Sequence, residues 1–297
     1  MRNAHAHVRT LFMTKNIVIT GASSGIGYAA AAELTKAGYH VFGSVRKATD
    51  AERVYTALGA NFTPLLMDVT DAAAIAVAME TVQAAVGEAG LAGLVNNAGI
   101  AVGGPLQHLP LDELRHQFEV NLFGLLAVTQ AFLPLLGARK HATHPPGRII
   151  NISSVSGIVS YPFLAPYVAS KHALEGLSDS LRVELKLYGI DVILIEPGSV
   201  RTPIWDKAEQ VDVARYAQSD YAPTLEKLRV NMLAMGRKGM PVERVAQAIR
   251  LALESPRPKA RYAMPDKWLV GWVMPHLLPT RWLDALVARY LGLRRTS

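Results

Sequence analysis

The chain has 297 residues, of which half are hydrophobic and 19% are charged, and this composition excludes a disordered protein. It contains no cysteine, which excludes disulfide frameworks, thiolate metal sites and a cysteine nucleophile. The absence of cysteine fits a reducing cytoplasm, where we expect the protein to lie. We expect no metal ligands in the functional site.

The formal net charge of +7 is concentrated near the C-terminal end of the sequence. Residues 255–297 contain eight basic and two acidic residues, so the preceding part of the chain is close to neutral. A nucleic-acid partner would need a basic face on the main domain, and we therefore expect none. No apolar run has the length of a membrane span, and we interpret residues 1–13 as an N-terminal extension.

Short apolar segments alternate along the chain with longer segments of helical periodicity. Strands are predicted at residues 16–20, 40–45, 62–67, 91–96, 148–153 and 191–196. Helices are predicted at residues 25–37, 49–58, 71–86, 111–136, 166–188 and 241–254. Because most strands are apolar on both faces, the alternation predicts an α/β fold with a doubly wound parallel sheet. Ligands bind such sheets at the carboxyl ends of the strands.

We interpret residues 14–264 as one α/β domain and residues 265–297 as an amphipathic helical tail. Within the domain, the stretch 203–240 has weak periodicity and several helix breakers. We expect this stretch to form a mobile lid.

The first predicted strand runs into a glycine-rich segment, Thr20 to Gly27, that opens the first helix. Glycines allow a tight turn and a close approach of the backbone to a phosphate, and the helix N-terminus offers free N–H groups. The segment therefore predicts a nucleotide-binding loop, with an ordinary glycine-rich turn as the alternative. The candidate residues for cofactor binding are Gly21, Ser23, Ser24, Gly25, Ile26 and Gly27.

Polar residues also follow the fourth and fifth predicted strands. The segment Asn96–Gly99 could contact a cofactor or form a strand-end turn. Ser153 and Ser154 close the next strand, where Ser154 could bind a substrate oxygen and both could instead cap a turn.

Tyr167 and Lys171 lie four residues apart at the start of a long predicted helix. This spacing places the phenol and the ammonium on one helix face. A cation beside a phenol lowers the phenol pKa from about 10 toward working pH, as a proton donor to a carbonyl requires. Taken alone, the pair is far more typical of a solvated helix face.

In this order and spacing, the motifs resemble the short-chain dehydrogenase/reductase family. The resemblance covers about residues 14–202 and is carried by Thr20–Gly27, Asp68, Asn96–Gly99, Asn121, Ser154, Tyr167, Lys171 and Pro197-Gly198. It implies a Rossmann-type sheet of about seven strands, and reversible hydride transfer between a nicotinamide cofactor and an alcohol or carbonyl. It also implies a homodimer or homotetramer.

The resemblance assigns a role to each matching residue. Tyr167 would be the general acid in reduction and the base in oxidation, and Lys171 would bind the nicotinamide ribose and lower the Tyr167 pKa. Ser154 would orient the substrate oxygen, and Asn121 would hold a water of the proton relay. The other positions implied to contact the cofactor are Asp68, Val69, Asn97, Ala98, Gly99, Pro197, Gly198, Val200 and Thr202.

The end of the second predicted strand bears on the choice between NAD and NADP. NAD-dependent members of the family usually carry an acidic residue there, which binds the ribose 2′-hydroxyl. Here Val45 stands in that place and is followed by Arg46 and Lys47. Because a guanidinium can form a fork with a 2′-phosphate, we predict a preference for NADP(H). The alternative is that Arg46 stacks on the adenine or is solvated.

The segments that build the substrate pocket in this family are mainly apolar in this chain. They contribute Ile100, Val102, Ile158, Val159, Tyr161, Phe163, Leu164, Ile204, Trp205, Met232 and Met235, some of which could be core residues. We therefore expect a hydrophobic ketone or secondary alcohol, of the steroid, retinoid or lipid kind. The alternatives are a carbonyl reductase of small polar substrates and a non-catalytic nucleotide-binding sensor or scaffold on the same fold.

The tail contains apolar residues at helical spacing between residues 281 and 293, opposite Arg281, Asp284 and Arg289. A second apolar cluster contains Trp268, Leu269, Trp272 and Val273. A basic amphipathic helix with tryptophan can bind an anionic membrane surface. Packing over the substrate pocket or across a subunit interface is the alternative that we favour.

Overall fold

The computed structural model describes residues 15–209, 214–268 and 273–293. The predicted N-terminal extension therefore lies outside the described residues. The same holds for Leu269 and Trp272 of the second apolar cluster and for part of the predicted lid.

Seven parallel strands form one sheet in the order β3-β2-β1-β4-β5-β6-β7, which confirms the predicted fold class. The strands are β1 (Lys15–Ile19), β2 (Tyr39–Val45), β3 (Phe62–Leu66), β4 (Gly93–Asn96), β5 (Arg148–Ile152), β6 (Asp191–Pro197) and β7 (Arg261–Met264). The first six lie within two residues of the predicted strands. The apolar pattern did not predict β7, which has four residues and begins with an arginine.

Helices connect the strands and extend beyond the sheet. They are α1 (Gly25–Lys36), α2 (Ala48–Leu58), α3 (Ala72–Val86), α4 (Leu111–Phe118), α5 (Leu125–Phe132), α6 (Ala165–Glu184), α7 (Ile204–Glu209), α8 (Ala222–Arg237), α9 (Val242–Glu254), α10 (Met274–Leu277) and α11 (Thr280–Leu291). Short helical turns are η1 (Gly59–Asn61), η2 (Gly87–Ala89), η3 (Glu119–Gly124), η4 (Leu133–Leu136), η5 (Val155–Gly157), η6 (Leu185–Tyr188) and η7 (Ala214–Tyr216).

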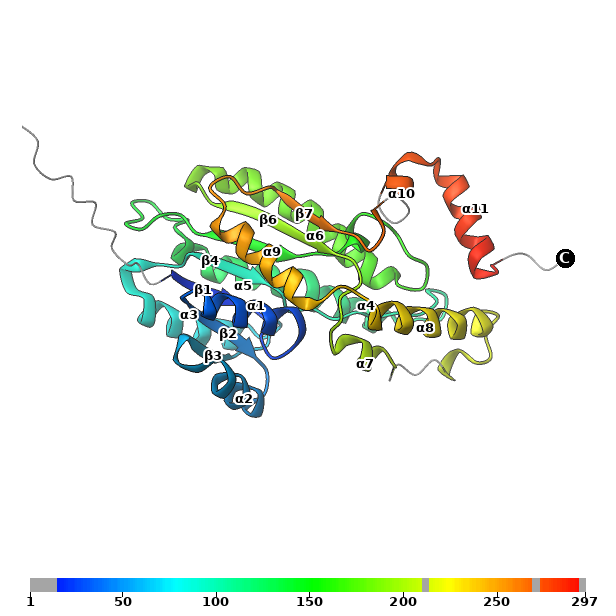
Figure 1. Cartoon of the computed structure of the whole chain (residues 1–297), viewed down its shortest axis with the longest axis horizontal. Helices are drawn as coiled ribbons and strands as arrows, with labels where there is room; N and C mark the ends of the chain where they lie inside the picture. The colour runs from blue at the N-terminus through cyan, green and yellow to red at the C-terminus, as the bar shows by residue number, and fades with distance from the viewer. Residues whose placement is uncertain (1–14, 210–213, 269–272, 294–297) are drawn as a thin grey trace, which may run out of the picture.

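Two hydrophobic layers hold the helices against the sheet. Ile17 and Ile19 of β1 join the core that contains α1, α2 and α9, whereas Val18 joins the core that contains α3, α5 and α6. Successive side chains of a strand point to opposite faces, so a strand without polar positions fills both layers. Figure 1 shows α7, α8, α10 and α11 gathered at one end of the molecule, beyond this sandwich.

The stretch predicted as a lid contains two helices, α7 and α8, despite its weak periodicity. Trp205 joins them because its ring packs where a side chain at Gly236 would stand, and its indole N–H donates to the Val200 carbonyl at 2.7 Å. A guanidinium–carboxylate pair between Arg215 and Glu113 links the stretch to α4. The mobility of the lid stays a prediction.

Two helical stretches, 72–89 and 111–136, are long and apolar enough by composition to cross a membrane, contrary to the expectation from the sequence. Both contribute buried residues to the core beneath the sheet, among them Val82 and Phe132. Buried helices in the cores of soluble proteins have the same length and apolar composition, so this composition is weak evidence for a membrane span.

Candidate active site

The glycine-rich loop is fixed to the end of β4 by a compact set of hydrogen bonds. The Asn97 amide donates to the Thr20 and Gly21 carbonyls at 2.9 and 3.0 Å, and the Thr20 hydroxyl accepts from the backbone N–H groups of Asn97 and Ala98. Gly21 has a φ of +68°, and a Cβ on Gly27 would stand 2.2 Å from the Gly21 carbonyl oxygen. Glycine is therefore required at both positions.

The start of α1 is open toward a ligand. Ser24 precedes the helix in extended conformation, and its side chain does not cap the first turn, so the first N–H groups remain without an intrahelical partner. Thr202, after β6, lies against Gly25, where a Cβ would stand 3.4 Å from the threonine methyl group. These features fit an anionic cofactor at the helix N-terminus, with Thr202 at its edge.

Two arginine side chains lie at the end of β2 and on the helix α2 that follows it. Val45 is buried, whereas the Arg46 side chain is 67% exposed and its Nη1 lies 3.8 Å from Asp68 Oδ2. Arg53 of α2 donates to the Ser23 carbonyl at 2.7 Å. No motif in the sequence points to Arg53, because this contact joins residues thirty positions apart and depends on where α2 packs.

Asp68 lies after β3, beside the same loop. Burial favours its neutral form, but two hydrogen bonds from Thr70 and the charge of Arg46 outweigh burial and lower the pKa of the carboxyl. The carboxylate is therefore ionised at neutral pH and available to a hydrogen-bond donor.

Asn121 stands inside a π-helical turn, η3, that interrupts the helix predicted over residues 111–136. Its Oδ1 accepts from the Ile100 N–H at 2.9 Å, and its Nδ2 donates to the Ile100 carbonyl and to Ser170 Oγ. Gln117, which the sequence did not single out, binds Ile100 and Val102 in the same way. Both amides thus fix the segment that follows the Asn96–Gly99 motif.

The π-turn ends at a residue that is packed closely against the loop after β3. A Cβ on Gly124 would stand 2.6 Å from the Val69 carbonyl oxygen, so the helix backbone passes directly over the loop after β3. Single π-turns are common at functional sites, since one extra residue re-aims the side chains of the turn. Here the turn buries Asn121.

Ser154, Tyr167 and Lys171 come together at the carboxyl end of β5. Lys171 Nζ donates to the Ile152 carbonyl at 2.7 Å and lies 5.7 Å from the centre of the Tyr167 ring. Ser154 Oγ accepts from the Ser156 N–H and lies 3.4 Å from the Pro197 carbonyl. The residues with predicted catalytic roles therefore lie on elements that meet at one sheet edge.

Burial controls the titration of this group. Desolvation raises the pKa of Tyr167, and the Ser154 hydroxyl acts in the opposite direction. Desolvation also lowers the pKa of Lys171 to about 8, against the effect of Glu175. The sequence predicts a Tyr167 pKa lowered by Lys171, whereas in this structure burial is the larger effect. At neutral pH the phenol holds its proton.

The predicted substrate-pocket residues differ in exposure. Tyr161, Ile204 and Met235 are exposed, and Val159 is buried. Phe163 has a φ of +65°, and its ring packs edge-on against Tyr221 at 5.6 Å. The remaining ones, Ile100, Val102, Ile158, Leu164, Trp205 and Met232, are partly buried. The predicted pocket residues thus include both exposed apolar side chains and partly buried ones.

Comparison with known proteins agrees with this geometry. A family model described as short chain dehydrogenase matches residues 15–212. NADPH-dependent 3-dehydrocapnine reductase of Ornithobacterium rhinotracheale is 43% identical over 269 residues, which cover 91% of this chain and 94% of that protein. Human dehydrogenase/reductase SDR family member 9 is 32% identical, with coverage of 93% and 88%.

Solved structures show the same architecture. A short-chain dehydrogenase from Streptomyces avermitilis has a TM-score of 0.72 at 29% identity, covering 94% of this chain and 97% of that one. The structure of ElxO with NADP bound has a TM-score of 0.68 at 24% identity, covering 84% and 96%. This second likeness shows the fold alone.

Replacement of Gly27 by alanine tests the loop geometry. The added Cβ would meet the Gly21 carbonyl and the Asn97 amide, so the loop must shift, and we expect NADPH affinity to fall on the order of tenfold to a hundredfold. Fluorescence titration of NADPH measures the change. Gly176→Ala is the matched control, because a Cβ there meets open space. Equal affinities for both variants would contradict the assignment of the loop.

Proposed function

The chain belongs to the short chain dehydrogenase family, and we propose that it is an NADP(H)-dependent oxidoreductase that interconverts a secondary alcohol and a carbonyl on a hydrophobic substrate. The observation that carries this proposal is the meeting of Tyr167, Ser154 and Lys171 at the end of β5, next to the strand β4 whose end holds the glycine-rich loop. A non-catalytic sensor would not need these groups.

In reduction, the Tyr167 hydroxyl would give its proton to the substrate oxygen, and Ser154 would hold the same oxygen by a hydrogen bond. When bound, the nicotinamide cofactor supplies the hydride to the carbonyl carbon. Lys171 would stabilise the phenolate that forms, and its hydrogen bond to Ile152 fixes the position of its amine. In oxidation the phenolate would take the hydroxyl proton back, which a positioned acid–base group achieves.

The residues around the loop fit a phosphorylated dinucleotide. The tight backbone at Gly21 and Gly27 and the uncapped start of α1 would hold the pyrophosphate. Arg46 is exposed beside the buried Val45, where an acidic residue would repel a 2′-phosphate. Preference for NADP(H) is also supported by the relative that is named an NADPH-dependent reductase. Asp68 would contact the adenine.

The proposed substrate class follows from the exposed apolar side chains near the sheet edge. Tyr161, Ile204 and Met235, from three segments that build the pocket in this family, each expose apolar surface. Apolar burial favours a substrate with a long or fused hydrocarbon body over a small polar carbonyl. The name of the 43% identical relative, a reductase of 3-dehydrocapnine, is consistent with a ketone as the oxidised form.

Replacement of Tyr167 by phenylalanine tests the mechanism. We expect kcat to fall roughly 100- to 10,000-fold, the range for loss of a general acid, with NADPH affinity largely kept. The assay follows NADPH absorbance with steroid, retinoid, long-chain and small polar carbonyls. Because the Tyr167 pKa is raised, oxidation should accelerate with rising pH while reduction stays steady through neutrality. Full activity of the variant would overturn the mechanism, and turnover of small polar carbonyls alone would overturn the substrate class.

Replacement of Arg46 by alanine tests the cofactor preference. Loss of a charged hydrogen bond, about 1.5–3 kcal/mol, should lower the ratio of kcat/KM for NADPH to that for NADH about tenfold to a hundredfold. Arg139→Ala, which removes an arginine from the loop after η4, should leave the ratio unchanged. A wild-type preference for NADH that Arg46→Ala does not alter would contradict the prediction.

We also propose self-association and cytoplasmic location. Phe123 of η3 is 53% exposed and Val183 at the end of α6 is 65% exposed. A second copy that covers these helices would remove the apolar surface from water. This observation supports the homodimer or homotetramer that the family resemblance implies.

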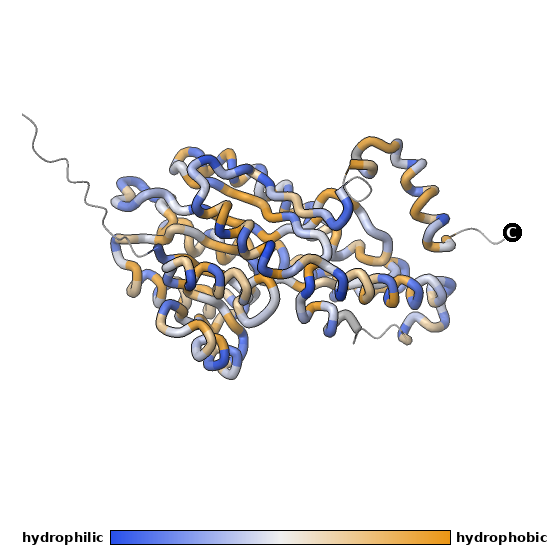
Figure 2. The backbone as a smooth tube through the Cα atoms, in the orientation of Figure 1, coloured by the Kyte–Doolittle hydropathy of each residue, from blue (hydrophilic) through white to orange (hydrophobic). Residues whose placement is uncertain are grey.

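The C-terminal helix α11 carries a further proposed contact. Leu291 is buried, and α8 donates to the last turn through Thr224 and Lys227. On the same apolar face Trp282 is 67% and Leu286 is 55% exposed, whereas the Lys227 ammonium lies over the Tyr290 ring at 5.5 Å. In Figure 2 hydrophobic and hydrophilic residues alternate along α11, which lies beyond the body of the protein. The last turn of α11 therefore packs against α8, and packing on the protein is the alternative that the sequence favours. We propose that the remaining apolar face contacts an anionic membrane surface.

Co-sedimentation with anionic and neutral vesicles tests this contact. The double substitution Trp282→Ser and Leu286→Ser should reduce binding to anionic vesicles, because each change removes exposed apolar area. Leu251→Ser, at an exposed position on α9, is the matched control. Equal sedimentation of all proteins with either vesicle would remove the membrane contact.

A further inference from the structure

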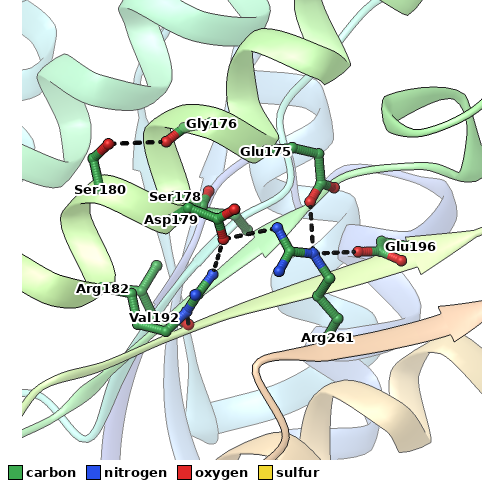
Figure 3. Close-up of polar contacts among 10 residues, drawn as sticks. Glu175, Gly176, Ser178, Asp179, Ser180, Arg182, Val192, Glu196 and Arg261 are labelled. Carbon is green, nitrogen blue, oxygen red and sulfur yellow. Dashed lines mark hydrogen bonds and ion pairs between the residues drawn. The ribbon is translucent and has the colours of Figure 1, made fainter.

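A cluster of charged side chains lies beneath the second half of α6 (Figure 3). Arg261 of β7 contacts Glu175 Oε2 and Glu196 Oε1 at 3.1 Å and Asp179 Oδ1 at 2.7 Å. Arg182 also binds Asp179. Glu196 is fully buried and Glu175 is 5% exposed. Buried carboxylates are costly unless they are paired, so their retention here asks for a reason.

Arg261 does not satisfy Glu175 completely. Glu175 Oε2 faces the Arg261 guanidinium. Glu175 Oε1 is buried and has no hydrogen-bond partner among the described residues. This side of the carboxylate lies under the turn that follows Ser154, 3.1 Å from the position of a Cβ on Gly157. Glu175 thus extends from the charged cluster toward the proposed catalytic groups.

Lys171 lies one helical turn before Glu175 on α6, and both side chains are buried. Residues four apart on a helix have Cβ atoms about 5–6 Å from each other. In a desolvated interior, opposite charges interact more strongly at a given distance than on the surface, so the Glu175 carboxylate can act on the Lys171 amine without touching it. The Lys171 amine is fixed against the Ile152 carbonyl and cannot move away into solvent.

We propose that Glu175 is a positioning residue for the reaction: its buried carboxylate, anchored by Arg261, keeps Lys171 in the charged form beside Tyr167. This inference rests on the proposed function, because it assigns Glu175 to the same site. Arg261 holds the carboxylate in place beneath α6. The charge of Glu175 then acts on Tyr167 through Lys171.

The titration of the surrounding groups agrees with the proposal. The groups that face Glu175 are Lys171 and Asp179 from α6, Glu196 from β6 and Arg261 from β7. Burial lowers the pKa of Lys171 to about 8, and Glu175 is the charge that opposes this effect. Burial, with the charge of Glu175, raises the pKa of Glu196 to about 7. Without Glu175, Lys171 would lose its proton at lower pH.

The decisive experiment compares Glu175→Gln with the wild-type protein, and Glu184→Gln is the control because Glu184 is exposed on the same helix. The first readout is the titration of the Lys171 Cε signal in protein labelled with carbon-13 lysine, assigned by its absence in Lys171→Met. The midpoint should lie near 8 in the wild-type protein and at lower pH in Glu175→Gln, because Glu175 is the charge that opposes the effect of burial on Lys171.

The second readout is the pH profile of kcat for oxidation. A neutral Lys171 no longer stabilises the phenolate, so kcat near neutral pH, where Lys171 of the wild-type protein is charged, should fall in Glu175→Gln and stay unchanged in Glu184→Gln. Glu175→Asp, which keeps the charge, should restore kcat toward the wild-type value. Glu175→Met removes the same charge with apolar atoms of similar volume, and it replaces Glu175→Gln if that variant does not fold.

A folded charge-removing variant with unchanged Lys171 midpoint and unchanged pH profile would overturn the inference and leave Glu175 a purely structural residue. A fall in melting temperature with both readouts unmoved would overturn it equally. These outcomes are separate from the test of the proposed function, since the lysine titration needs no turnover. Full activity of Tyr167→Phe would overturn the mechanism itself.

Discussion

Parallel pairing of β1, β4, β5 and β6 is the constraint on which the site depends, because it brings the carboxyl ends of four strands to one edge. Buried polar contacts then fix α6 across these strands. Asn96 donates to Asn151 at 2.9 Å, and Asn151 donates to Ser178 of α6 at 2.9 Å. Such buried hydrogen bonds tolerate little displacement, since each unpaired group would carry the full cost of desolvation. The phenol and the amine of α6 are thereby held at the sheet edge.

The sequence predicted what depends on local pattern. Six strands were apparent because both faces of each are apolar, and the glycines, Tyr167 and Lys171 stand at fixed spacings in one segment each. Only the family resemblance predicted a seventh strand. The short β7 depends on tertiary contacts, namely its pairing with β6 and the contacts of Arg261. Its own residues carry no alternation that a pattern could detect.

Features that depend on tertiary contact were not predictable. The π-turn at Asn121 ends at Gly124, which packs closely over Val69, and apolar periodicity over residues 111–136 does not reveal one extra residue in a turn. Gln117 and Arg53 act on backbone groups that only the folded chain brings near. The direction of the Tyr167 pKa shift was also missed, because a pairwise view of phenol and amine leaves out the desolvation that both undergo.

Desolvation explains why the proposed acid–base pair needs support from outside itself. Burial favours the neutral form of both Tyr167 and Lys171, which suits proton donation in reduction but removes the charge that would stabilise the phenolate. A third charge of negative sign near the amine restores its ammonium form without touching the substrate. Glu175 meets this need, and its own burial is in turn possible because Arg261 lies against it. Burying the charged cluster costs free energy of desolvation, and its electrostatic support of the site explains why it is present.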